Sequence, residues 1–83
     1  MNLEVITPDK KLYTGEIYSI RLPGTRGSFE ILHNHAPIIS TLNRGELEIV
    51  AEDKERLTIE IGGGLVECRN NTILVLAEPA KPE

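Results

Sequence analysis

Closely spaced turn signals constrain the fold of this chain more than any other sequence feature. Clusters of Gly, Pro, Asn and Asp recur roughly every 6–12 residues and separate short apolar runs. Residues 57–61 alternate strictly between apolar and polar side chains, which is the pattern of a half-buried strand. No segment of about 10 residues or more repeats with the helical period. We therefore predict an all-β fold without a helical domain, a flattened sandwich or barrel of about nine to ten short strands in two sheets.

Three turn-forming sites predict how some of these strands are joined. Gly15 indicates a break or bulge after a short strand at residues 12–14. The triplet Gly62-Gly63-Gly64 indicates a bulge, or a strand crossing where side chains would not fit. Asn70 and Asn71 tolerate positive φ and predict a two-residue hairpin.

Length and composition indicate one small domain. We assign residues 1–78 to the domain and expect the Pro-rich residues 79–83 to form a flexible tail. The chain has 83 residues and a net charge of −4, with three aromatic side chains, which disfavours nucleic-acid binding and an anionic membrane patch. A single cysteine, no signal-like N-terminus and no apolar run of transmembrane length lead us to expect a soluble intracellular protein.

Candidate catalytic and ligand-binding groups do not assemble into a site. His33 and His35 are two residues apart, but zinc needs three or four ligands and Cys68 lies far away in the chain. Surface or interface histidines are the favoured interpretation. Ser28 and Ser40 lack the strand-turn-helix elbow of a nucleophile, and the glycine triplet lacks the Lys-Ser/Thr of a phosphate loop. We predict no enzyme activity and no catalytic, metal or cofactor-binding site.

Residues 22–42 stand apart as a long irregular stretch. They contain two of the five prolines, two of the seven glycines, both histidines and the one phenylalanine. Loops supported by rigid sheets are where small β domains usually bear function. We expect the working surface of the protein here.

The ordered landmarks of the chain resemble the N-terminal β-sandwich domain of the epsilon subunit of F-type ATP synthases. The family usually has Pro-Gly before its loop histidine, whereas this chain has His33-Asn34, and Asn also accepts the left-handed conformation. Two further positions differ from the family: Glu30 stands after Phe29 where glycine is common, and Gly62 stands before the Gly-Gly pair where serine is frequent. The matching motifs cover nearly the whole chain: LEVITP (3–8), YTG (13–15), LPGTRGSF (22–29), HAP (35–37), LNRG (42–45), GGLVE (63–67) and VLAE (75–78).

The resemblance implies a rotor part that performs no chemistry. Such proteins link the gamma subunit to the membrane c-ring in the central stalk, on the cytoplasmic side of the bacterial inner membrane, and couple proton translocation to ATP synthesis. The family's C-terminal helical hairpin has no counterpart here, so we transfer neither its inhibition of hydrolysis nor its ATP binding. We expect the isolated chain to be monomeric. Residue by residue, the implied c-ring contacts are Gly24, Thr25, Arg26, Gly27 and Ser28, and the implied gamma contacts are Thr7, His35, Ala36, Pro37, Ile38 and Ser40.

Two other classes of protein compete with this interpretation. A biotinyl or lipoyl carrier domain is also a small flattened β structure, and Lys54 lies at an expected hairpin tip where such a domain has its modified lysine. The Met or Asp-Ala flanks of a carrier lysine are missing. A five-stranded nucleic-acid-binding barrel is disfavoured by the charge and by the few aromatics.

Overall fold

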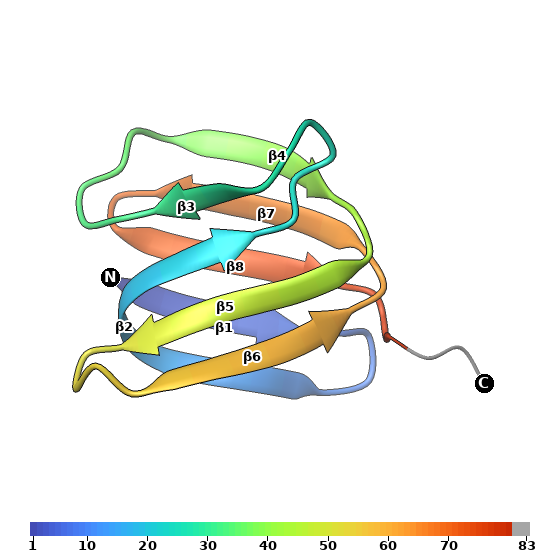
Figure 1. The fold of residues 1–83 in the computed structure, drawn as a ribbon, viewed down its shortest axis with the longest axis horizontal. Coiled ribbons are helices and arrows are strands. Elements are labelled where there is room, and N and C mark those ends of the chain that lie inside the picture. Colours follow the sequence, from blue (N-terminus) through green and yellow to red (C-terminus); the bar gives the residue numbers. More distant parts are fainter. Residues whose placement is uncertain (81–83) are drawn as a thin grey trace.

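The computed structural model describes residues 1–80 and shows a chain made of eight strands, with no helix among those residues (Figure 1). The all-β prediction is confirmed. The count is eight because the chain runs unbroken through Gly15, where two strands were predicted. The strands are β1 (Asn2–Ile6), β2 (Lys11–Leu22), β3 (Phe29–Ile31), β4 (Ile38–Leu42), β5 (Gly45–Ala51), β6 (Arg56–Ile61), β7 (Gly64–Arg69) and β8 (Thr72–Ala77).

The strands form one curled sheet in the order β4-β7-β8-β1-β2-β5-β6, with β3 also paired to β2. All neighbours are antiparallel except β1 and β8, which are parallel. In Figure 1, β3, β5 and β6 lie in front of β1, β7 and β8. We call the layer of β4, β7, β8, β1 and the first half of β2 the five-stranded sheet, and the layer of β3, the second half of β2, β5 and β6 the four-stranded sheet.

The long strand β2 joins the two layers. Its first half pairs with β1, and Gly15 lies opposite Leu3 there. Its second half pairs with β3 on one edge and β5 on the other. The register with β5 shifts between Ile17 and Ser19, so the irregularity lies just beyond the glycine. An extra residue of this kind bends and twists a strand, which lets β2 pass from one layer to the other.

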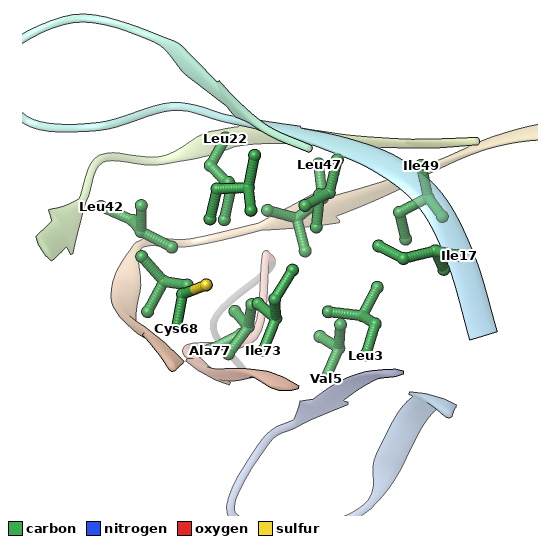
Figure 2. Packing of buried hydrophobic residues seen from close by; sticks show 14 of the residues in the cluster. Leu3, Val5, Ile17, Leu22, Leu42, Leu47, Ile49, Cys68, Ile73 and Ala77 are labelled. Atoms are coloured by element: carbon green, nitrogen blue, oxygen red, sulfur yellow. The ribbon is translucent and has the colours of Figure 1, made fainter. Parts of the chain in front are cut away.

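The core fills the space between the two layers. Side chains alternate between buried and exposed along β1, β5, β7 and β8, so every second residue faces inward. Figure 2 shows Leu3, Val5 and Ile73 of one layer facing Leu47 and Ile49 of the other. The buried apolar residues are Met1, Leu3, Val5, Ile17, Ile20, Leu22, Ile31, Leu42, Leu47, Ile49, Ile61, Val66, Cys68, Ile73, Val75 and Ala77.

The glycine triplet is where the chain crosses from the four-stranded sheet to the five-stranded sheet. Strand β6 ends at Ile61 and β7 begins at Gly64. Between them the Gly62 N–H donates to the Glu78 carbonyl at 2.8 Å, and the Glu78 N–H donates to the Gly63 carbonyl at 2.9 Å. The predicted strand crossing is confirmed.

The β7–β8 hairpin has the predicted two-residue turn. Asn70 and Asn71 have φ of 52° and 61°, the left-handed values that such a turn requires. Of the expected tail at residues 79–83, residues 81–83 lie outside the described part of the chain, and the Ala80 carbonyl accepts a hydrogen bond from the Arg44 guanidinium at 2.7 Å. Residues 1–80 contain no helix long and apolar enough to span a membrane.

Candidate partner-binding site

The turn between β2 and β3 lies beside the end of β4, although the two are far apart in sequence. The Thr25 N–H donates to the Thr41 carbonyl at 3.1 Å, and the hydroxyls of these two threonines are 2.8 Å apart. The Asn43 N–H donates to the Pro23 carbonyl at 2.7 Å. These hydrogen bonds hold the turn at residues 24–28 against the end of β4, which is the edge strand of the five-stranded sheet.

A hollow of about 630 Å³ opens between this turn and β4, and we call it the seam hollow. All five residues implied as c-ring contacts line it, and so do two residues implied as gamma contacts, Ile38 and Ser40. The structure therefore brings part of the two predicted sets to one place. The lining consists of Gly24, Thr25, Arg26, Gly27, Ser28, Phe29, Ile38, Ile39, Ser40, Thr41 and Leu65.

Glycine is needed at both ends of the turn. Gly27 has a φ of 123°, a conformation that residues with a Cβ rarely adopt. At Gly24 a Cβ would lie 2.7 Å from both the Gly27 carbonyl oxygen and the Phe29 ring. Between these glycines Arg26 is exposed, and its guanidinium has no ion-pair or hydrogen-bond partner within residues 1–80. The turn presents a free cation on a closely folded backbone.

The predicted gamma contacts do not form one cluster. Thr7 follows β1 at the end of the five-stranded sheet where β1 lies beside Leu76. There it lines a depression of about 230 Å³ together with Ile6, Pro8, Leu76 and Ala77. The loop that contains His35 precedes Ile38, whose register partner Cys68 lies towards the other end of that sheet.

Hydrogen bonds fix the loop that contains both histidines. Asn34 has a φ of 62°, the left-handed conformation that asparagine accepts in place of the family's glycine. Its N–H donates to Asn71 Oδ1 at 2.9 Å, so the Asn71 amide nitrogen, 3.1 Å from His33 Nδ1, donates to that ring atom. His35 Nδ1 donates to the Ala36 carbonyl at 2.6 Å. In the part of the chain that the structure describes, no three His, Cys, Asp or Glu side chains are grouped to hold a metal ion.

Apolar side chains that the sequence reasoning missed lie on the outside of the five-stranded sheet, beside two carboxylates: Glu67 lies opposite Ile39 and Leu74, and Glu4 lies opposite Leu74. Leu65 of β7 lies opposite Leu76 of β8, which lies opposite Ile6 of β1. Ile39 and Leu76 are 69% and 43% exposed. The signal was hidden because the run at residues 72–76 is apolar on both faces and resembles a fully buried strand. The outer apolar face, as we call it, consists of Ile6, Ile39, Leu65, Leu74 and Leu76.

The outside of the four-stranded sheet has the opposite character. Glu46 and Glu48 of β5 and Glu60 of β6 are exposed, and Glu46 lies directly opposite Glu60. Arg21 is 3.9 Å from Glu30 beside them. Like charges directly opposite each other destabilise a sheet, and contact with water reduces their repulsion. We therefore call the outside of the four-stranded sheet the acidic face.

Within residues 1–80, two groups have a shifted pKa. A hydrogen bond from the Asn2 side chain, with the N-terminal ammonium 3.4 Å away, lowers the pKa of Glu16 below its ordinary value of 4.5. Burial raises the pKa of the Cys68 thiol, which keeps it protonated. Cys68 lies in β7 with its side chain buried in the core.

The candidate carrier lysine lies back on the protein surface. Lys54 is in the β5–β6 turn, and its Nζ is 3.3 Å from the centroid of the Tyr18 ring. A carrier lysine must extend into solvent to be modified and to reach its enzymes. The cation–π contact therefore gives no support to the carrier interpretation.

Comparison with known proteins identifies one family. The family described as "ATP synthase, Delta/Epsilon chain, beta-sandwich domain" matches residues 1–83. An ATP synthase epsilon chain of Leptospira borgpetersenii serovar Hardjo-bovis is 44% identical over 78 residues, which are 94% of this chain and 61% of the relative. The epsilon chain of Chlorobaculum tepidum is 36% identical over 76 residues, with 92% and 86% of the two chains covered. The chain spans about three fifths of the Leptospira relatives' length.

Solved structures share the fold. A chain of the Euglena gracilis mitochondrial ATP synthase, in an assembly of OSCP, F1 and c-ring, aligns with a TM-score of 0.84 at 17% identity, covering 95% of this chain and 49% of that one. A chain of the Tetrahymena thermophila mitochondrial ATP synthase central stalk and c-ring aligns with a TM-score of 0.76 at 21% identity, covering 93% and 62%.

Proposed function

Because the chain belongs to the ATP synthase delta/epsilon family of β-sandwich domains, we propose that it is a non-catalytic rotor part of the central stalk. In this role it links the gamma subunit to the c-ring on the cytoplasmic side of the membrane, without entering the bilayer, and helps to couple proton translocation to ATP synthesis. The single observation behind this proposal is the match of the family over the whole chain.

The outer apolar face supports a contact with the gamma subunit. Large exposed apolar patches on soluble domains mark partner surfaces, and permanent interfaces are more apolar than transient ones. The implied gamma contacts border this face: Thr7 adjoins Ile6 at one end of the sheet, and Ile38 and Ser40 flank Ile39 in β4. We propose that gamma packs against the face and its borders, including the loop with His35, Ala36 and Pro37.

The turn at residues 24–28 supports a contact with the polar loops of the c-ring. Its two glycines let backbone groups approach a partner closely, and the free guanidinium of Arg26 offers paired N–H donors to a carboxylate. The bonds between Thr25 and Thr41 hold the turn on the sheet, so a force applied at the turn reaches the body of the domain.

The first test is co-expression of this chain with its gamma subunit, followed by size-exclusion chromatography. We expect a stable one-to-one complex, because Ile39, Leu65 and Leu76 of the outer apolar face are exposed and a partner would remove them from water. A chain that elutes alone at micromolar concentration would overturn the rotor proposal.

The second test is assembly of that complex on purified c-ring. We expect Arg26→Glu to weaken assembly, because it places a negative charge where a cation meets the ring loops. Arg56→Glu makes the same charge change in β6, away from the turn, and is the matched control. Equal assembly of the two variants would contradict the placement of the ring contact.

A further inference from the structure

Strand β4 has one paired edge and one largely open edge. It pairs with β7 from Ile38 to Leu42 without a register shift. On its other edge, within residues 1–80, it meets the start of the β2–β3 turn through the bridge between Gly24 and Leu42, the bond from Thr25 N–H to the Thr41 carbonyl and the bond between their hydroxyls. The open part of this edge borders the seam hollow.

The direction of the Thr41 carbonyl shows which backbone groups are free. Since it points away from β7 towards Thr25, alternation along an antiparallel strand turns the backbone groups of Ile39 the same way. The N–H and C=O of Ile39 and the N–H of Thr41 therefore face the open edge. No strand within residues 1–80 pairs with them there.

This edge lacks the protection that natural sheets give to exposed edges. Charged residues, proline within the strand, or a bulge normally prevent another chain from pairing. Strand β4 reads IISTL and has none of these, whereas β6, at the other end of the strand order, bears Arg56 and Glu60. Ile39, at the centre of the edge, is 69% exposed.

The lining of the seam hollow indicates what chemistry would fill it. Thr25, Ser28, Ser40 and Thr41 offer hydroxyls, and Arg26 is the one charged residue among the lining side chains. An extended segment with a carboxylate would satisfy both the open backbone edge and the free guanidinium. A second copy of β4 has no carboxylate to offer, so charge complementarity favours a different partner.

We propose that the open edge of β4 docks an extended segment of a partner protein as an additional strand, with an Asp or Glu of that segment at Arg26. Backbone bonds to Ile39 and Thr41 would give affinity, and the carboxylate would fix the position of the segment along the edge. Such docking extends the proposed function without resting on it, since it needs only β4 and the turn.

The test is an NMR titration of the ¹⁵N-labelled full chain with the blocked peptide acetyl-Thr-Val-Asp-Val-Thr-Val-amide. We expect the amide signals of Ile39 and Thr41 to shift and their hydrogen exchange with water to slow. A peptide with Asn in place of Asp should bind about two- to fivefold more weakly. With Arg26→Glu, a peptide with Lys at that position should become the preferred one.

Other outcomes would overturn the inference. Shifts confined to Ile6, Leu65, Leu74 and Leu76, no shifts at the highest peptide concentration, or protection of the Ile39 amide by self-association would each do so. Ile39→Pro removes one edge donor that faces away from β7, and it should reduce binding. If that variant does not fold, the charge-swapped pair at Arg26 decides alone. Absence of peptide binding in a chain that still forms the gamma complex would reject strand docking and leave the rotor role standing.

Discussion

Ile20 and Ile39 are the same residue type in opposite surroundings. Ile20 lies in β2 between β3 and β5 and is fully buried, while Ile39 is 69% exposed. A buried isoleucine contributes both its transfer from water and its close packing, whereas an exposed one contributes little to folding. Ile20 therefore contributes to stability, whereas Ile39 is available to contact a partner.

We expect Ile20→Ala to lower the free energy of unfolding by about 2–5 kcal/mol, because it removes buried methyl groups and leaves a cavity. The matched control Ile39→Ala should change it by less than about 0.5 kcal/mol. Urea unfolding followed by circular dichroism measures both. Equal losses would mean that β4 is covered in the isolated chain.

The lowered pKa of Glu16 makes the stability of the fold slightly dependent on pH in acid. The hydrogen bond from Asn2 is the main cause that lowers the pKa of Glu16 in the folded chain. The carboxylate therefore stabilises the fold at a pH above its ordinary pKa of 4.5, and this stabilisation is lost as the pH falls through the lowered folded pKa. We expect Glu16→Gln to lower the melting temperature near neutral pH and to have little effect in strong acid. A difference that stays constant across this range would show that the carboxylate is not the cause.

At the scale of elements, the glycine crossing is a backbone packing site rather than a ligand loop. A Cβ at Gly62 would collide with the Pro79 carbonyl oxygen, and one at Gly64 with the Leu76 carbonyl oxygen. Both clashes are with backbone, which cannot rotate away as a side chain can. At this crossing the backbones approach too closely for side chains at Gly62 and Gly64.

Gly62→Ala is expected to cost about 1–3 kcal/mol, because it pushes Pro79 away and strains the bond from Gly62 to Glu78. Denaturant unfolding measures the loss. Gly27→Ala is the control, since a Cβ there meets no atom within 4 Å and the variant suffers only from its φ of 123°, about 1 kcal/mol. A smaller loss for Gly62→Ala than for Gly27→Ala would contradict the packing explanation.

Strand β2 shows where local patterns mislead. Gly15 predicted a break or bulge, yet the strand continues through it because β1 pairs with this part of β2. The bend lies instead at the register shift between Ile17 and Ser19. Nothing in those side chains marks the position, since it depends on where β5 begins to pair.

At the scale of the whole molecule, the two outer faces differ in chemistry. The outside of the five-stranded sheet combines the outer apolar face with Glu4 and Glu67, while the other side has Glu46, Glu48 and Glu60. The proposed contact with gamma on one face, with the acidic face left in water, fits this asymmetry. The asymmetry also orients the domain, because burying the acidic side would remove several charges from water.

We expect Leu65→Lys to weaken the complex with gamma by at least about fivefold, because it puts a charge in the centre of the outer apolar face. Thr58→Lys, an exposed change on the acidic side, is the matched control and should leave binding unchanged. Surface plasmon resonance with immobilised gamma compares them. If Thr58→Lys weakened binding more than Leu65→Lys, gamma would bind the acidic side, and our placement would be wrong.

The sequence by itself determined those features that depend on neighbouring residues. Alternation and turn residues predicted the all-β class, the Asn70-Asn71 hairpin and a bulge or crossing at the glycine triplet, because each follows from local sterics. The ordered motifs also led to the family that the comparisons confirm.

Only the tertiary structure decided which strands are neighbours. The parallel pair of β1 and β8, and the meeting of Thr25 with Thr41, join residues that are far apart in the chain. Backbone pairing is chemically the same for any two strands, so side-chain packing in the core selects the partners. The seam hollow, the open edge of β4 and the outer apolar face all result from that selection.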